Sequence, residues 1–198
     1  FTWLDEELED LWKKPTYTSA YKKGNISLQF SENSNEMLVE EISKIKKGST
    51  DSQNCALFIA ELMEQIDLKC REYSEALGNL DSIAGDGDHG IGMEKGAKAA
   101  AKAARNFASS GAGAGSTLIA AGEAWSDKAG GTSGIIWGII LKEMGKAIDD
   151  QERPNLKTIS RAIGQASEKV TSFGKAQLGD KTLVDVLIPF NQKMFELA

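Results

Sequence analysis

The chain has 198 residues, of which 41% are hydrophobic and 26% are charged, the balance of an ordinary globular protein. Its formal net charge of -6 argues against a general binder of nucleic acid or of anionic membranes, because such a surface offers phosphate groups no net attraction. No apolar run approaches the roughly 20 residues that cross a bilayer, and the first residues show no signal-peptide pattern. We therefore expect a cytoplasmic protein.

Three segments make up the N-terminal part of the chain. Residues 4–13 place apolar side chains at helical spacing, residues 15–35 lose this periodicity, and a second helix is expected at about 35–47. The chain opens inside one amphipathic segment and stops inside another, with no cap or stop signal at either end. We therefore interpret it as part of a longer polypeptide.

A long helix is predicted from a cap at Thr50 or Asp51 to about Gly78. Cys55 and Cys70 fall on this helix fifteen residues apart, too far for a disulfide at about 1.5 Å of rise per residue. Two free buried thiols in a reducing compartment are the expectation. The predicted apolar face carries Phe58, Ile59, Leu62, Met63, Ile66, Cys70, Tyr73 and Leu77.

Further helical patterns follow, joined by glycine-rich turns. They lie at about 91–108, from Ser116 as a cap to about Lys128, over "IIWGIILKEMGKAI", at about 156–173, and after "GDKT". Strand alternation is absent after residue 30, so the sequence predicts an all-α fold. Trp125 and Trp137 sit at helical spacing and are assigned to the core rather than to a ligand stack.

Three aspartates and the only histidine of the chain gather in the turn "LDSIAGDGDHGIGM". Asp86 and Asp88 can converge on one ion where glycines let the backbone fold back, and Asp81 adds a third carboxylate. All-oxygen ligation favours Mg²⁺ or Ca²⁺ over zinc, and the spacing is not that of an EF-hand loop. The alternative is a solvated turn that caps the next helix. For His89 we favour a phosphate or water contact over a metal ligand, and no neighbouring residues support triad chemistry.

A second turn, "AGGTSG", stands just before an apolar helix. The backbone N–H groups of Gly131, Thr132 and Ser133, together with two hydroxyls, are typical of an anion cradle at a helix N-terminus. A plain turn in which Thr132 or Ser133 caps the helix is the alternative.

A third turn combines Gly179, the capping residue Asp180 and the hydroxyl of Thr182 at the start of the last helix. Alone it is a weak signal. A cation site and two anion cradles on one helical domain are, together, what a metal–nucleotide complex requires.

The stretches "LDSIAGDGDHGIGMEKG", "AGGTSGIIWG" and "GDKTLVDVLIP" resemble the three successive signatures of the nucleotide-binding L domain of dihydroxyacetone kinases. The opening "FTWLDEELEDLWKKP" is similar to the C-terminal tail of the sugar-binding K domain in this family. The resemblance implies a K-domain tail at 1–14, a linker at 15–35 and an L domain at 36–198. It also implies an antiparallel helical barrel, here without its last helices.

The resemblance further implies a site for ATP or ADP and two Mg²⁺ ions, with four catalytic residues. Asp81, Asp86 and Asp88 match the metal-binding carboxylates, His89 the histidine near the phosphates, Gly131, Thr132 and Ser133 the phosphate-cradling turn, and Gly179, Asp180 and Thr182 the segment flanking the nucleotide.

The implied activity is that of an ATP-dependent kinase of the glycerone type. The γ-phosphate would pass directly to a hydroxyl of dihydroxyacetone, glyceraldehyde or a four-carbon ketose presented by the K domain. Almost all of the K domain is absent, so we do not expect this chain to be competent alone. A homodimer is expected for the full-length protein, with no nucleic-acid or membrane partner.

Three alternatives stay open. The chain could belong to an ADP-carrying subunit that a phosphotransferase protein rephosphorylates, although the attached K-domain tail argues against this. The resemblance also allows a nucleotidyl cyclase side activity that splits a flavin nucleotide. A helical scaffold whose acidic loop binds Ca²⁺ only for structure belongs to a different class.

Overall fold

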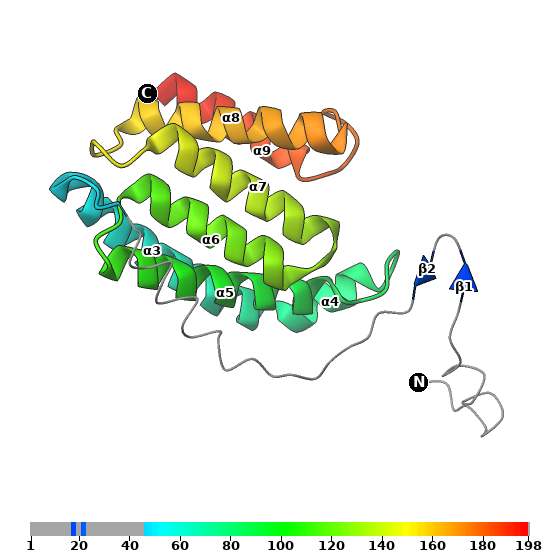
Figure 1. Cartoon of the computed structure of the whole chain (residues 1–198). Helices are drawn as coiled ribbons and strands as arrows, with labels where there is room; N and C mark the ends of the chain where they lie inside the picture. Colours follow the sequence, from blue (N-terminus) through cyan, green and yellow to red (C-terminus); the bar gives the residue numbers. More distant parts are fainter. Residues whose placement is uncertain (1–16, 19–20, 23–45, 198) are drawn as a thin grey trace. The chain divides into compact units, whose positions relative to one another are not determined.

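The computed structural model describes residues 17–18, 21–22 and 46–197 (Figure 1). The chain divides into two units, Phe1–Met37 and Leu38–Ala198, and each is described by itself.

In the first unit, β1 (Tyr17–Thr18) and β2 (Tyr21–Lys22) form a two-stranded antiparallel pair, within the segment predicted as a linker. Tyr17 pairs with Lys22 and Thr18 with Tyr21. The helices predicted at 4–13 and, except for its last two residues, 35–47 lie outside the described residues and stay predictions.

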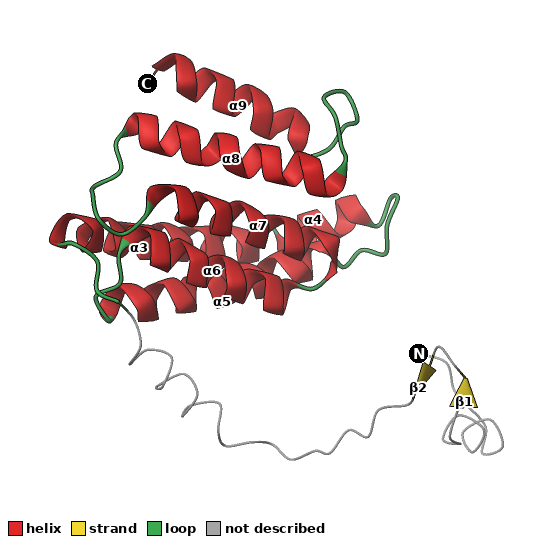
Figure 2. Ribbon diagram, turned by 45° about the horizontal axis from the view of Figure 1, so that its top comes forward, coloured by secondary structure: helices red, strands yellow, loops and turns green. Residues whose placement is uncertain are grey.

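The described part of the second unit is entirely helical, so the prediction of an all-α fold is confirmed. Each helix from α5 onward packs against the next, and α3 packs against α5 and α6 (Figures 1 and 2). The outermost helices, α3 and α9, do not pack against each other, so the helices form an open layer rather than a closed barrel. The bounds are α3 (Thr50–Glu72), α4 (Ser74–Asp81), α5 (His89–Ser109), α6 (Ala114–Ala129), α7 (Gly131–Ile148), α8 (Leu156–Gly174) and α9 (Val184–Leu197).

The first of these helices, α3, begins at a side-chain cap and ends at a break in the helix. The hydroxyl of Ser49 accepts the Ser52 N–H at 3.1 Å, so α3 is capped one residue before the predicted positions. The helix breaks at Tyr73, and the single long helix predicted here is therefore two, α3 and α4.

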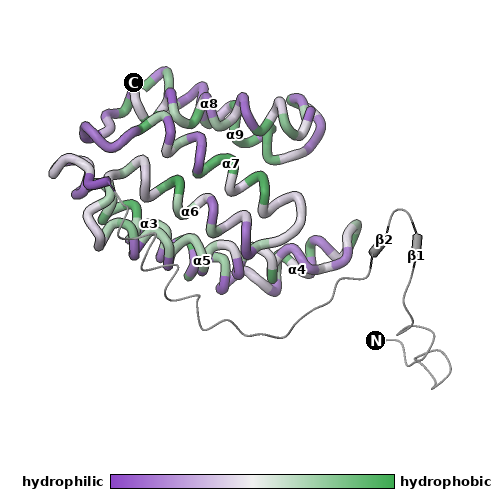
Figure 3. The backbone as a smooth tube through the Cα atoms, in the orientation of Figure 1, coloured by the Kyte–Doolittle hydropathy of each residue, from purple (hydrophilic) through white to green (hydrophobic). Residues whose placement is uncertain are grey.

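Small residues let the central helices approach closely. A side chain at Gly122 of α6 would place its Cβ 2.7 Å from the carbonyl oxygen of Gly138 in α7, a distance that only glycine avoids. Trp125 is 2% exposed and packs 5.8 Å from Trp137, centroid to centroid, which confirms their assignment to the core. Figure 3 shows hydrophobic segments along α6 and α7, in the middle of the layer. None of the described helices is long and apolar enough to cross a membrane.

The apolar face predicted for α3 is partly wrong. The helix buries a stripe that contains Ala56, Ala60 and Met63, whereas Phe58 is 60% exposed. Alanines on α3 and α5 allow close contact along that stripe, and the larger side chains lie on the neighbouring stripe, which no described helix covers. Four predicted inward residues are therefore exposed, namely Phe58, Leu62, Ile66 and Tyr73.

Asp150 ties together the turns at one end of the layer. Its carboxylate accepts the backbone N–H of Ser116 at 2.9 Å and the Ser116 hydroxyl at 2.5 Å. Its carbonyl oxygen accepts the Ser49 N–H at 2.9 Å. Ser116, predicted as the cap of α6, is instead the third residue of a helix that begins at Ala114. The loop between α7 and α8 thus supplies the cap that α6 lacks.

We expect Asp150→Ala to destabilise the full-length protein by about 1–2 kcal/mol, because Ser116 loses a charge-assisted cap and the turns lose their link. Urea unfolding followed by circular dichroism measures the change. Glu152→Ala, in the same loop, is the matched control and should change stability by less than about 0.5 kcal/mol. Equal stability of the two variants would contradict a capping role for Asp150.

Candidate metal centre and neighbouring turns

From α4 onward, successive helices run antiparallel, so alternate turns lie at the same end (Figures 1 and 2). The α4–α5, α6–α7 and α8–α9 turns share one end, and Asp150 lies at the other. The three signatures found in the sequence are these three turns.

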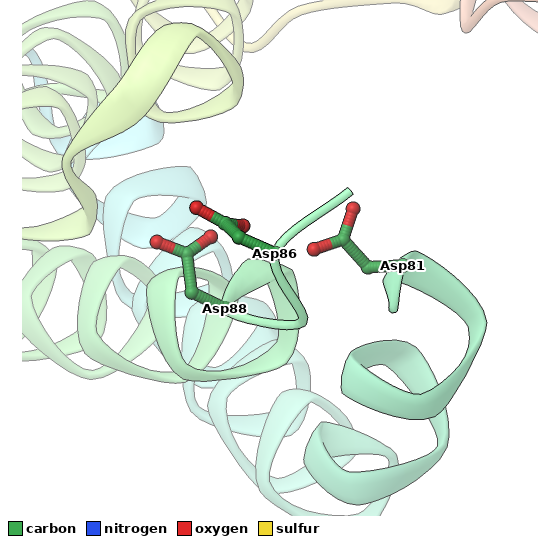
Figure 4. A group of neighbouring side chains, drawn as sticks. All are labelled: Asp81, Asp86 and Asp88. Atoms are coloured by element: carbon green, nitrogen blue, oxygen red, sulfur yellow. The ribbon is translucent and has the colours of Figure 1, made fainter. Parts of the chain in front are cut away.

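The three aspartates of the first turn converge. Asp81 ends α4, Asp86 lies in the loop, and Asp88 directly precedes α5 (Figure 4). Each offers a carboxylate oxygen, and these oxygens all lie within 4.8 Å of one another. Asp86 and Asp88 are exposed and Asp81 is half-buried. This all-oxygen donor set suits a hard divalent cation such as Mg²⁺ or Ca²⁺.

Asp81 also builds the turn that brings the other two carboxylates together. Its Oδ2 accepts the N–H of Gly87 at 2.9 Å and, more weakly, that of His89 at 3.4 Å. Gly87 has a φ of +81°, which a residue with a side chain rarely adopts. The glycine and the Asp81 carboxylate together fold the loop back on the end of α4.

Asp88 bears on the alternative in which this turn only caps the next helix. It occupies the N-cap position of α5, but its side chain makes no capping hydrogen bond. In the described part of the chain, no ion pair involves Asp81, Asp86 or Asp88. The carboxylates thus repel one another with no ion-pair partner in the described chain, an arrangement that a bound cation would relieve.

His89 begins α5 and is half-buried. Its backbone N–H donates to Asp81, but its ring is not part of the group of ligand atoms that the aspartates form. The geometry therefore gives no support to the imidazole as a fourth ligand of that group.

The second turn leaves the N-terminus of α7 open. The helix begins at Gly131, its N-cap is Gly130 with a φ of +71°, and no side chain caps it. Thr132 and Ser133 lie in the first turn of the helix, so the alternative in which one of them is the cap is wrong. The first N–H groups of α7 have no side-chain partner and are available to an anion.

The third turn differs, because a carboxylate of the chain occupies its N–H groups. Asp185 accepts the Gly179 N–H at 2.6 Å and the Thr182 N–H at 2.9 Å. The cradle predicted at Gly179, Asp180 and Thr182 is therefore partly filled by the protein itself. Asp185 was not among the residues predicted from the sequence, although Thr182 and an acidic residue three positions later form the capping-box pattern.

A family model described as "DAK2 domain" matches residues 83–198, more than half of the chain. The chain belongs to the DAK2 domain family. The predicted resemblance to the L domain of dihydroxyacetone kinases is thereby confirmed. The domain bounds and the roles of the individual site residues stay predictions.

Three curated relatives of this DAK2 domain show how far the similarity extends. An L-erythrulose kinase of Pectobacterium atrosepticum is 44% identical over 190 residues, which are 96% of this chain and 32% of that protein. A D-erythrulose kinase of Mycolicibacterium smegmatis is 40% identical over 197 residues, 97% of this chain and 34% of that protein. The ADP-binding subunit DhaL of a PEP-dependent dihydroxyacetone kinase of Listeria innocua is 32% identical over 121 residues, 61% of this chain and 60% of that subunit. The chain thus spans about a third of the length of the two erythrulose kinases.

We expect Asp86→Asn to raise the unfolding temperature of the full-length protein in EDTA by about 2 °C, because it removes one of the mutually repelling charges. Added MgCl₂ should raise the unfolding temperature of the unaltered protein and leave that of the variant unchanged. Differential scanning calorimetry measures both.

The matched control is Asp127→Asn, which removes a carboxylate that pairs with Lys128 on the exposed surface. It should respond to MgCl₂ as the unaltered protein does. A Mg²⁺ response that persists in Asp86→Asn would contradict the assignment of this carboxylate to a cation site.

Proposed function

We propose that this DAK2 domain is the ATP-binding, phosphoryl-donating part of an ATP-dependent kinase that acts on a short ketose. The observation that carries the proposal is the convergence of the Asp81, Asp86 and Asp88 carboxylates within 4.8 Å. They lie at the same end of the layer as the open N-terminus of α7. A site with unpaired carboxylates and unpaired N–H groups matches a nucleotide bound together with its metal ions.

The carboxylates would hold two Mg²⁺ ions. Of their six oxygens, only Oδ2 of Asp81 is engaged by hydrogen bonds within the described chain, which leaves the other five for ligation. Bound Mg²⁺ would neutralise phosphate charge and align the γ-phosphoryl group. Asp81 acts twice in this arrangement, as a ligand through its free oxygen and as the residue that fixes the turn.

The other residues bind and orient the phosphates. The N–H groups of Gly131, Thr132 and Ser133 and the two hydroxyls bind phosphate oxygens at the N-terminus of α7. His89, at the first position of α5, contacts a phosphate or a bound water. Charge neutralisation and alignment suffice for direct transfer to an acceptor hydroxyl, so the mechanism needs no covalent phospho-enzyme.

The extent of the similarity supports a single-chain kinase. The two erythrulose kinases match nearly the whole chain, whereas the DhaL subunit matches 61% of it. We therefore assign residues 1–14 to the tail of a K domain, 15–35 to a linker and 36–198 to the L domain. A four-carbon ketose such as erythrulose, presented by the K domain, is the proposed acceptor. An ADP-carrying subunit is the second candidate, since the DhaL relative is named for ADP binding.

We expect Asp86→Asn to abolish the binding of Mg·ATP by the full-length protein and to leave its circular dichroism spectrum unchanged. Isothermal titration calorimetry measures the affinity, and Asp127→Asn is again the control that should bind normally. Unchanged affinity in Asp86→Asn would refute the proposed site.

A coupled assay of ADP release, run with erythrulose, dihydroxyacetone and glyceraldehyde, identifies the acceptor. We expect the highest kcat/KM with erythrulose. Tightly bound ADP and no ketose-dependent release of ADP from ATP would favour the phosphotransferase-dependent subunit. Stabilisation by Ca²⁺ alone, without any effect of nucleotide, would favour the structural scaffold.

A further inference from the structure

The α8–α9 turn is held by one carboxylate on both sides of Lys181. Asp185 accepts the N–H of Gly179 through Oδ1 and that of Thr182 through Oδ2. These bonds lower the pKa of the Asp185 carboxyl below its usual value. A lowered carboxyl pKa means that the restraint is complete above the ordinary aspartate range and is lost only as the pH falls through the lowered value. At neutral pH the carboxylate is charged and the turn is held.

Lys181 sits at the centre of this turn with a φ of +59°, in the left-handed region. Residues with a side chain rarely adopt this region, which is strained for them. In the other two turns at this end of the layer, the positive-φ positions are the glycines Gly87, Gly130 and Gly131. Lys181 differs from these glycines in carrying a side chain, and this side chain is therefore what the strained position presents.

Some polar groups of the α8–α9 turn make hydrogen bonds within the turn, and others are free to bind a ligand. Asp185 is engaged by backbone N–H groups, and Oδ2 of Asp180 accepts the N–H of Gln177 at 2.8 Å. The hydroxyl oxygen of Thr182 accepts the Val184 N–H at 3.2 Å, which leaves its proton to donate. Lys181 is exposed, and no ion pair within the described chain engages its ammonium group.

We propose that Asp185 is a positioning residue that holds Lys181 in its left-handed conformation, so that the ammonium group of Lys181 and the hydroxyl of Thr182 contact the nucleotide phosphates. The inference rests on the proposed function, since it adds Lys181 and Asp185 to the same site and gives Thr182 a contact there. It also revises the role predicted for this turn. The turn presents side-chain donors to the phosphates, while Asp185 takes the backbone N–H groups of Gly179 and Thr182.

Substitutions of Lys181 test the contact in the full-length protein, with Mg·ATP affinity and the unfolding temperature as paired measurements. Lys181→Asn keeps a residue that tolerates the left-handed region but removes the charge. We expect it to weaken Mg·ATP binding about tenfold, without lowering the unfolding temperature. Lys181→Arg keeps the charge and should bind within about twofold of the unaltered protein.

The chain offers a matched control in Lys175, an exposed lysine in the same loop with a φ of +56°. It is the C-cap of α8, where a left-handed residue serves only to end the helix. Lys175→Asn should bind Mg·ATP with unchanged affinity. A general effect of lysine charge or of turn flexibility would weaken both asparagine variants alike and would overturn the inference.

The double variant tests whether Asp185 acts through Lys181. Asp185→Asn should weaken Mg·ATP binding about as much as Lys181→Asn, and the two together should cost little more than either alone. Additive losses would show that Asp185 does not act through Lys181 and would overturn its assignment as a positioning residue.

The unaltered protein separates failure of this inference from failure of the proposed function. No binding of Mg·ATP by the unaltered protein would refute both. Binding by the unaltered protein together with full affinity in Lys181→Asn would refute the inference alone.

Discussion

Carboxylates that accept backbone N–H groups hold the turns of this helical layer in place. Asp81 folds the α4–α5 turn, Asp150 joins the α7–α8 loop to the first turn of α6 at the opposite end, and Asp185 fixes the α8–α9 turn. Glycine-rich turns have many accessible backbone conformations, so ordering them costs more entropy than ordering other sequences. A charged acceptor makes stronger hydrogen bonds than a neutral one and selects a single conformation for each turn.

A carboxylate that accepts backbone N–H groups also decides whether a turn can bind an external anion. Where a carboxylate of the chain already occupies the N–H groups, they are not available. Both the α6–α7 and the α8–α9 turns combine glycine with hydroxyl side chains at the start of a helix, and both therefore resemble phosphate cradles in sequence. At the N-terminus of α7, the cap is Gly130, which has no oxygen to offer the first N–H groups. In the α8–α9 turn, Asp185 supplies the anion from within the chain. Whether such a turn has N–H groups available for a phosphate therefore depends on one side chain outside the glycine motif, which in the α8–α9 turn is Asp185.

The features that could be predicted from the sequence are those that depend on residues close together in the chain. Hydrophobic periodicity and glycine turns located α5 to α9. The structure adds that the three signatures share one end, because helices joined by short turns run antiparallel. The cap of α6 could not be predicted, since Asp150 lies 34 residues from Ser116 and no local pattern joins them. The buried face of α3 was partly mistaken because periodicity marks two adjacent stripes on this helix. The alanine-rich surface of α5 selects the stripe of Ala56 and Ala60, and Phe58 remains outside.

The two ends of the layer satisfy their polar groups in different ways. At the end of the layer where Asp150 lies, each carboxylate oxygen of this residue accepts a hydrogen bond from Ser116, so these oxygens need no ligand. At the other end, three carboxylates repel one another and the first N–H groups of α7 lack a side-chain partner. This end therefore has hydrogen-bond donors without side-chain partners on the α6–α7 turn and carboxylates without ion-pair partners on the α4–α5 turn. A cation alone would relieve only the carboxylates, and an anion alone only the N–H groups. A phosphate chain carrying its own divalent ions relieves both at once, which is the physical reason to expect a metal–nucleotide complex at this end.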